Sequence, residues 1–311
     1  MLYLQIIVLA LIQGMAELLP ISSSAHVIVA EKLMGLDPSA PKEVFLLVML
    51  HTGTMFAVLF YFWPRWRPLL FPPKGSGVVF ASEDGGEDEG RKRLPTPFQS
   101  GRYDFLKMVV LATLCTGIVG LGLKEGIERI LFVAILGQSK GEVEHLFKNL
   151  PLIATGLFAV GILILAAGSR DSKVQKLVIG TKSSVLIGVV QGLCLPFRGF
   201  SRSGATISTA LFRDIKRPLA EDFSFALAVV LTPPVIVWEL RRLLKASDWQ
   251  ASQELVPLLL PGLTGMVFSF LAGLLALRIL STVLEKGRWK YFGFYCMAAS
   301  AVVLILGLVQ G

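Results

Sequence analysis

The stretch QGMAELLPISSSAH, from Gln13 to His26, and its counterpart QGLCLPFRGFSRSGAT, from Gln191 to Thr206, decide how this chain folds. Each stretch follows an apolar run, opens with Gln-Gly and ends in a serine-rich turn before another apolar run. Polar, turn-forming residues are costly in lipid and persist where they line a cavity enclosed by protein. Paired interruptions in the two halves of a membrane protein therefore predict a site at the interface of inverted repeats.

The composition indicates a membrane protein. Apolar residues make up 54% of the 311 residues, charged residues only 17%, and the mean hydropathy is +0.68. Soluble domains usually carry about 25% charged residues, and several apolar runs here reach the ~20 residues that cross a bilayer. The net charge of +8 comes mainly from Lys and Arg in short loops, which indicates topology rather than binding to nucleic acid. We expect one polytopic, all-α membrane domain over residues 1–311.

Ten apolar segments divide into two sets of five, separated by a basic linker near 169–182. The first two segments of each half are short and broken by Pro, Ser and Gly, and we predict that each pair forms a re-entrant helical hairpin. The other six are candidate transmembrane helices. Three full crossings per half predict inverted-topology repeats, at about 1–169 and 180–311. The segments are 2–19, 23–35, 44–63, 104–123, 150–168, 183–196, 204–213, 222–244, 255–281 and 289–310.

The distribution of Lys and Arg predicts the orientation. With the N-terminus outside, 17 of these residues fall in inside loops and 9 in outside loops, as the positive-inside rule favours. The first hairpin then enters from outside and the second from the cytoplasm, with their tips meeting near the midplane. The polar insert at 72–101 is expected to be a solvated cytoplasmic loop, with a docking or regulatory loop as the alternative.

The first turn supplies four candidates for chemistry: Glu17, Ser22, Ser23 and His26. Glu17 is expensive to bury in an apolar segment, so it either lies at a helix end or binds a cation or proton beside a phosphorylated substrate. The serines either cap the next helix or join its free N–H groups in binding a phosphate. His26 could share one helical face with both serines and serve acid–base or nucleophilic chemistry. His51, within 44–63, is expected to make a polar contact rather than to catalyse.

The second turn supplies four candidate ligands for an anion: Ser201, Arg202, Ser203 and Thr206. An unpaired arginine in apolar surroundings would be very costly. Arg202 therefore either forms an internal salt bridge to Glu17 or clamps a phosphate or diphosphate in a bidentate manner. Arg198 either reaches the same anion or faces solvent.

These residues carry a family resemblance. ELLPISSSAH resembles the first signature of the bacterial undecaprenyl-diphosphate phosphatases, the family linked to bacitracin resistance, and GFSRSGAT resembles the second. LHTGTMFAVLFYFW and EDFSFALAV match further family segments, so that only 72–101 falls outside the resemblance. The resemblance implies inverted repeats with two re-entrant hairpins in the bacterial cytoplasmic membrane. It also implies removal of the terminal phosphate from undecaprenyl diphosphate at a site facing the periplasm, which recycles the lipid carrier of peptidoglycan synthesis.

The resemblance further implies a divalent cation, Mg²⁺ or Ca²⁺, and assigns roles. Glu17 would bind the metal and share catalysis with Ser23, His26 and Arg202. The residues that would contact the substrate are Gln13, Ser22, Ser201, Ser203, Thr206 and Arg198. The nucleophile stays open between Ser22, Ser23, His26 and water.

Three departures from the family pattern affect these expectations. Gln13 stands where the family has its first Glu, so that pair offers no two-carboxylate metal site. Ala25 replaces the Gly before the His, and PFRGF at 196–200 is one residue longer than the usual turn. Two other functions compete: a lipid-carrier flippase, which would use the same anion-binding groups, and an inactive, lipid-binding family member, which Gln13 suggests.

Overall fold

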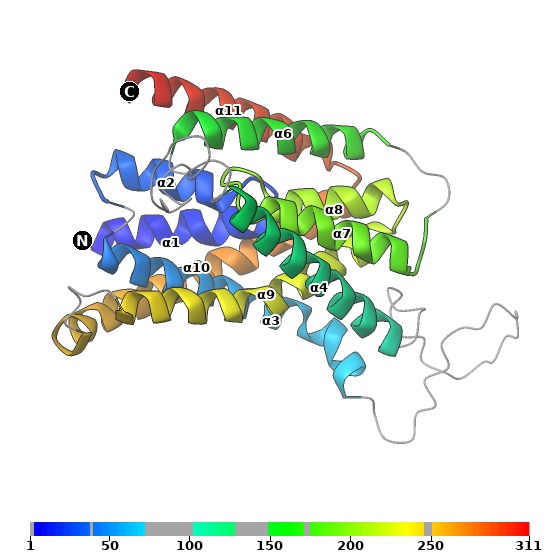
Figure 1. Ribbon diagram of the computed structural model, residues 1–311, viewed down its shortest axis with the longest axis horizontal. Coiled ribbons are helices and arrows are strands. Elements are labelled where there is room, and N and C mark those ends of the chain that lie inside the picture. Colours follow the sequence, from blue (N-terminus) through cyan, green and yellow to red (C-terminus); the bar gives the residue numbers. More distant parts are fainter. Residues whose placement is uncertain are drawn as a thin grey trace, which may run out of the picture.

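The computed structural model describes residues 3–37, 40–71, 102–127, 149–170, 175–245 and 251–310 (Figure 1). Within these ranges the chain is helical, with ten helices, no named strand and one isolated bridge between Lys176 and Ile215. The helices are α1 (Tyr3–Leu18), α2 (Ser23–Leu33), α3 (Pro41–Leu70), α4 (Arg102–Ile127), α6 (Leu150–Gly168), α7 (Thr181–Cys194), α8 (Arg202–Phe212), α9 (Arg217–Lys245), α10 (Ala251–Glu285) and α11 (Lys290–Gln310). Each of the ten predicted apolar segments corresponds to one of them, which confirms the all-α prediction. The predicted insert at 72–101 lies outside the described residues.

Six of the described helices, α3, α4, α6, α9, α10 and α11, are long and apolar enough to cross a membrane. This number agrees with the sequence-based prediction of six spans. The other four helices have 16, 11, 14 and 11 residues. At ~1.5 Å per residue the longest of them reaches ~24 Å, which is less than the ~30 Å hydrocarbon core.

Large apolar side chains remain exposed on the outer faces of the long helices. Ile118 of α4 is 74% exposed, and Leu308 and Val309 of α11 are 72% and 78% exposed. A water-soluble protein would bury such residues, whereas lipid solvates them at no cost. The outer surface therefore suits a bilayer.

The spans pack closely through small residues. Figure 1 shows α6 lying alongside α11, and a Cβ added to Gly161 of α6 would lie 3.2 Å from the Gly293 carbonyl oxygen of α11. The reverse is also true, because a Cβ on Gly293 would lie 2.9 Å from the Gly161 oxygen. Glycines at a helix contact let two backbones approach closely, as is common in membranes.

A polar cluster ties α3, α9 and α10 together. Arg65 of α3 lies 3.3 Å from Asp222 of α9, and the Ser281 hydroxyl of α10 donates to Glu221 at 2.5 Å. Tyr61 of α3 donates to the same serine at 2.9 Å. These contacts pair Glu221 and one oxygen of Asp222, which lowers the cost of burying the two carboxylates, and they fix α9 beside the two turns.

The two serine-rich turns meet in the middle of the molecule. In Figure 1, α1 and α2 approach the centre from one side and α7 and α8 from the other. The Gly199 amide donates to Ser24 Oγ at 3.2 Å, and the Ser203 hydroxyl lies 3.4 Å from the Leu19 carbonyl oxygen. Segments about 180 residues apart in the sequence thus form one surface.

Candidate active site

Glu17 is the centre of the site. It lies in the last turn of α1, and its Oε2 accepts a hydrogen bond from the Ser23 hydroxyl at 2.5 Å and from the Gln13 amide at 3.3 Å. Its Oε1 lies 3.1 Å from a guanidinium nitrogen of Arg202, at the start of α8. His51 Nε2 of α3 lies 3.7 Å from Oε2. One carboxylate therefore joins both turns and the first long span.

The local backbone explains how Ser23 reaches Glu17. α1 ends at Leu18, just before Pro20, and α2 begins at Ser23. Between them Ser22 has a φ of +68°, in the left-handed region that costs a residue other than glycine about 1–3 kcal/mol. The sharp turn folds the start of α2 back onto the end of α1.

The two turns differ in how their serines are used. Ser201 caps α8, because its hydroxyl accepts from the Gly204 amide at 3.2 Å. Ser22 precedes α2 in the same way but makes no capping bond with its side chain. Its hydroxyl instead lies 3.3 Å from that of Ser24. The capping alternative, which the sequence left open for the first turn, is thus wrong for Ser22, whereas Ser201, expected only as an anion ligand, is a helix cap.

The charge on Glu17 is stabilised by its neighbours. Burial alone would raise the pKa of Glu17, but His51, Arg202 and the donors Ser23 and Gln13 together hold it below the ordinary value of 4.5. The carboxylate is therefore ionised at neutral pH. Burial also lowers the pKa of His26, so that its imidazole is neutral there.

His26 lies beside this centre without bonding to it. Its Nδ1 lies 2.8 Å from the Ser22 carbonyl oxygen, and its Nε2 lies 2.8 Å from the hydroxyl of Tyr295 on α11. Among the described residues, none of its hydrogen bonds goes to Glu17 or Ser23. Sequence reasoning placed His26 with the serines and missed Tyr295, which looks like any other aromatic residue of an apolar span.

Arg202 forms the salt bridge to Glu17 that the sequence left as one of two alternatives. The two side chains are 20% and 17% exposed, so the pair is largely shielded from water. Arg198, in the same turn, is partly buried and makes no hydrogen bond or ion pair within the described part of the chain. An entering anion could thus compete with Glu17 for Arg202.

The remaining predicted ligands are held in the packing of the second turn. The Thr206 hydroxyl pairs with Ser224 of α9 at 2.6 Å and donates to the Arg202 carbonyl at 2.9 Å. Ser203 is buried against the first turn, and Ser201 is occupied as the cap. These contacts position Arg202 rather than present hydroxyl groups to an open space.

A narrow pocket opens onto the Glu17–Arg202 pair. Its lining comes from α1, α3, α8 and α9 and consists of Glu17, Leu18, His51, Thr54, Met55, Val58, Arg202, Ala228, Val229 and Thr232. From the sequence we expected His51 to make a polar contact, and it does so, with the Leu47 carbonyl oxygen. The sequence did not predict that its Nε2 faces Glu17, and the one indication of a role in the site was the presence of a histidine within an apolar run.

Glu17 and His51 could serve as two ligands of one divalent cation, with the substrate supplying further ligands. His51 Nδ1 lies 2.8 Å from the Leu47 carbonyl oxygen and must donate to it, so Nε2 is the ring nitrogen turned toward Glu17. A divalent cation bound between them would take the place of a proton on Nε2 and accept an electron pair from each side. In the described ranges no three His, Cys, Asp or Glu residues gather, so phosphate oxygens and water would have to supply the other ligands.

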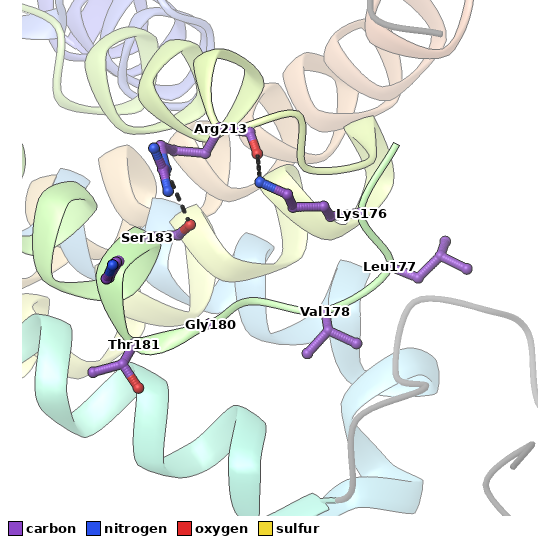
Figure 2. Close-up of a pocket in the computed structure, with 8 residues that line it drawn as sticks. Lys176, Leu177, Val178, Gly180, Thr181, Ser183 and Arg213 are labelled. Atoms are coloured by element: carbon purple, nitrogen blue, oxygen red, sulfur yellow. Dashed lines mark hydrogen bonds between the residues drawn. The ribbon is translucent and has the colours of Figure 1, made fainter. Parts of the chain in front are cut away.

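A second hollow lies at the segment before α7 and has no residue in common with the pocket at Glu17. Figure 2 shows Lys176 and Ser183 both turned toward Arg213 at the end of α8. Lys176 Nζ donates to the Arg213 carbonyl at 3.0 Å, and the Arg213 guanidinium donates to the Ser183 hydroxyl at 3.3 Å. These bonds tie the linker between the two halves to α7 and α8.

Comparison with known proteins finds relatives along nearly the whole chain. The family model described as "Bacitracin resistance protein BacA" matches residues 6–302. Undecaprenyl-diphosphatase 2 of Acinetobacter baylyi is 53% identical over 306 residues, which cover 97% of this chain and 97% of that protein. Undecaprenyl-diphosphatase of Desulfosudis oleivorans is 31% identical over 98% of both chains. Undecaprenyl-diphosphatase 2 of Burkholderia thailandensis is 31% identical over 96% of this chain and 95% of its own.

Proposed function

Because this chain belongs to the family of the bacitracin resistance protein BacA, we propose that it hydrolyses undecaprenyl diphosphate to undecaprenyl phosphate and phosphate. The family resemblance predicted from the two turns is confirmed, and the relatives' names favour a phosphatase over a flippase. The observation that carries the proposal is Glu17 of one turn bound at once to Ser23 and to Arg202 of the other. Recycling the lipid carrier in this way serves peptidoglycan synthesis and confers bacitracin resistance.

Arg202 binds the diphosphate. Phosphate oxygens carry more charge than one carboxylate oxygen, and the planar guanidinium matches two of them at once. When the substrate enters, Arg202 exchanges its contact with Glu17 Oε1 for these oxygens and stabilises the charge of the phosphoryl-transfer transition state. The partly buried Arg198 lies close enough in the chain to assist.

Glu17 takes the proton of the nucleophile. Its Oε2 already accepts from the Ser23 hydroxyl, so Ser23 either attacks the terminal phosphorus or orients the water that does. In the first case the Oγ–P bond forms, the P–O bond to undecaprenyl phosphate breaks, and the proton moves to Glu17. Water then releases phosphate from the serine. In the second case a water oxygen attacks the phosphorus, the same P–O bond breaks, and Glu17 takes the proton from that water.

Glu17 and His51 would hold the divalent cation, Mg²⁺ or Ca²⁺, together with substrate oxygens. The cation neutralises phosphate charge when bound. The Gln13 amide donates to Glu17 in place of a second carboxylate, so the site carries one negative charge fewer. His51 of α3 would supply the second protein ligand.

The packing supports the finer topology, two inverted repeats whose first helix pairs are re-entrant. α1 packs against α10 and α7 against α4, so each half lends its short helix to a span of the other. A Cβ on Gly14 of α1 would lie 2.6 Å from the Ser269 carbonyl oxygen, and one on Gly192 of α7 would lie 2.9 Å from that of Thr116. A reciprocal exchange of this kind is what a two-fold axis between the halves produces.

We propose that the N-terminus and the site face the periplasm of the cytoplasmic membrane. A single cysteine at Asn149 should then react in intact cells with a thiol reagent that cannot cross the membrane, and one at Lys286 should not. The native cysteines are Cys115, Cys194 and Cys296, and the background must lack them. The reverse labelling pattern would overturn the orientation.

The chemical roles are tested with detergent-purified variants. Glu17→Gln removes the proton acceptor and the charge, and we expect phosphate release to fall at least about a hundredfold. Ser23→Ala distinguishes attack by the serine from attack by water. The substitution abolishes turnover if the serine is the nucleophile and only slows it if water is. EDTA should stop release and Mg²⁺ or Ca²⁺ restore it. Activity of Glu17→Gln near that of the wild type would contradict the assignment.

A further inference from the structure

The hydrogen bonds of His26 define which of its nitrogens carries the proton. A backbone carbonyl only accepts, so the 2.8 Å contact to the Ser22 oxygen requires hydrogen on Nδ1. In neutral His26 the lone pair is therefore on Nε2. The Tyr295 hydroxyl lies 2.8 Å from Nε2 and must donate to it. The rings are also stacked, with centroids 5.7 Å apart and planes 14° apart.

This arrangement leaves His26 without a free basic atom. A proton acceptor for Ser23 needs an accessible lone pair within hydrogen-bond reach. The one lone pair of His26 is already used by Tyr295, whereas Glu17 Oε2 already accepts from Ser23.

The bond from Nδ1 acts on the most strained point of the site. The Ser22 peptide has a φ of +68° and precedes Ser23 directly. By holding the Ser22 carbonyl, the imidazole fixes the turn that aims the Ser23 hydroxyl at Glu17. Tyr295 in turn keeps the ring in the orientation that presents Nδ1 to that carbonyl.

We propose that Tyr295 and His26 are positioning residues: Tyr295 of α11 fixes the Nδ1–H form of His26, and His26 holds the Ser22 turn so that Ser23 faces Glu17. This inference rests on the proposed phosphatase function. It assigns a role to α11, which also contacts the first turn through Cys296, whose thiol donates to the Pro20 carbonyl oxygen at 3.3 Å. The proton of the reaction passes to Glu17 and never to His26.

Two substitutions of His26 separate positioning from proton transfer. In His26→Asn the side-chain amide nitrogen occupies the place of Nδ1 and can still donate to the Ser22 carbonyl. In His26→Gln the amide reaches the place of Nε2 instead. We expect His26→Asn to keep at least about tenfold more phosphatase activity than His26→Gln, because only the first preserves the bond to the turn. Neither amide can carry a proton, so a proton-transfer role predicts equal loss in both.

Tyr295→Phe keeps the stacked ring and removes only the hydroxyl. We expect kcat to fall about five- to tenfold, the scale of one net hydrogen bond, with KM nearly unchanged. Tyr291→Phe is the matched control, because Tyr291 lies one turn earlier on α11 and is similarly exposed, 57% against 46%. It should leave both constants unchanged.

Nuclear magnetic resonance of protein labelled with ¹⁵N only at its three histidines reads the tautomer directly and needs no activity. The wild type should show His26 protonated at Nδ1, and Tyr295→Phe should shift its Nε2 resonance. A His26 protonated at Nε2, or equal losses in folded His26→Asn and His26→Gln, would overturn the proposal. A wild type that releases no phosphate would instead refute the proposed function, while the tautomer would still test this inference.

Discussion

Replacing Arg202 by alanine tests the contact that joins the two turns. The guanidinium lies 3.1 Å from Glu17, and the side chains are only 20% and 17% exposed, so water screens the pair weakly. Removing one member of a buried pair costs about 3–5 kcal/mol when the other charge is left alone. Glu17 keeps two donors, Ser23 and Gln13. We therefore expect Arg202→Ala to lower the free energy of unfolding by roughly 2 kcal/mol.

The effect on the reaction should be larger than the effect on stability. Loss of one donor that stabilises transition-state charge costs about 10²–10³ in kcat. We expect Arg202→Ala to lose at least about a hundredfold, and Arg202→Lys less, because lysine keeps the charge but not the bidentate fork. Arg198→Ala should cost less than Arg202→Ala, since that guanidinium has no ion pair in the described ranges. The assay is the initial rate of phosphate release at saturating undecaprenyl diphosphate.

A double variant checks the reasoning behind these magnitudes. In Glu17→Gln/Arg202→Ala no buried charge is left alone, so its free energy of unfolding should lie closer to the wild type than that of Arg202→Ala. Thermal unfolding in detergent supplies the comparison. An Arg202→Ala turnover within about threefold of the wild type, or a double variant that is destabilised by the sum of the two single effects, would contradict the role given to this ion pair.

Three further results are expected. Gly53→Ala should destabilise the protein by about 1–3 kcal/mol in thermal unfolding, because a Cβ there would overlap a carbonyl of α10. Gly117→Ala, whose Cβ would meet nothing within 4 Å, should not, and equal effects would contradict the packing. Gln13→Glu should bind Mn²⁺ more tightly than the wild type in electron paramagnetic resonance titrations, since it adds a carboxylate beside Glu17; unchanged affinity would argue against a cation there. Because the pKa of Glu17 is lowered, its ion pair with Arg202 is fully formed above 4.5 and is lost as the pH falls below that value. The difference in unfolding temperature between wild type and Glu17→Gln should shrink in that range, and a constant difference would contradict the ion pair.

The helices were predictable from the sequence because unpaired backbone N–H and C=O groups are costly in lipid. A long apolar run satisfies these groups within itself only by forming a helix. The segment predicted at 150–168 matches α6 at both ends. α3 was predicted over 44–63 and runs to Leu70, since Pro64 and Pro68 remain inside the helix. A proline usually ends a helix in sequence reasoning, but membrane helices tolerate it.

Individual contacts of the site were less predictable. The sequence put Glu17 and Arg202 in the two turns but could not choose between their mutual salt bridge and an anion clamp, since that depends on their separation in space. Ser22 and Ser201 both precede a helix, yet only Ser201 caps, because the φ of Ser22 is +68° and that of Ser201 is −65°. Tyr295 had no signal that distinguished it from the other aromatic residues of α11.

The phosphatase function and its need for both turns are tested together by incubating the detergent-purified protein with undecaprenyl diphosphate and Mg²⁺, in the absence of any sealed bilayer. Phosphate and undecaprenyl phosphate are measured in the same sample. We expect the two products to appear in equal amounts and Arg202→Ala to abolish both. A protein that binds the lipid, releases no phosphate, and moves the lipid across the membrane of sealed vesicles would contradict the phosphatase function.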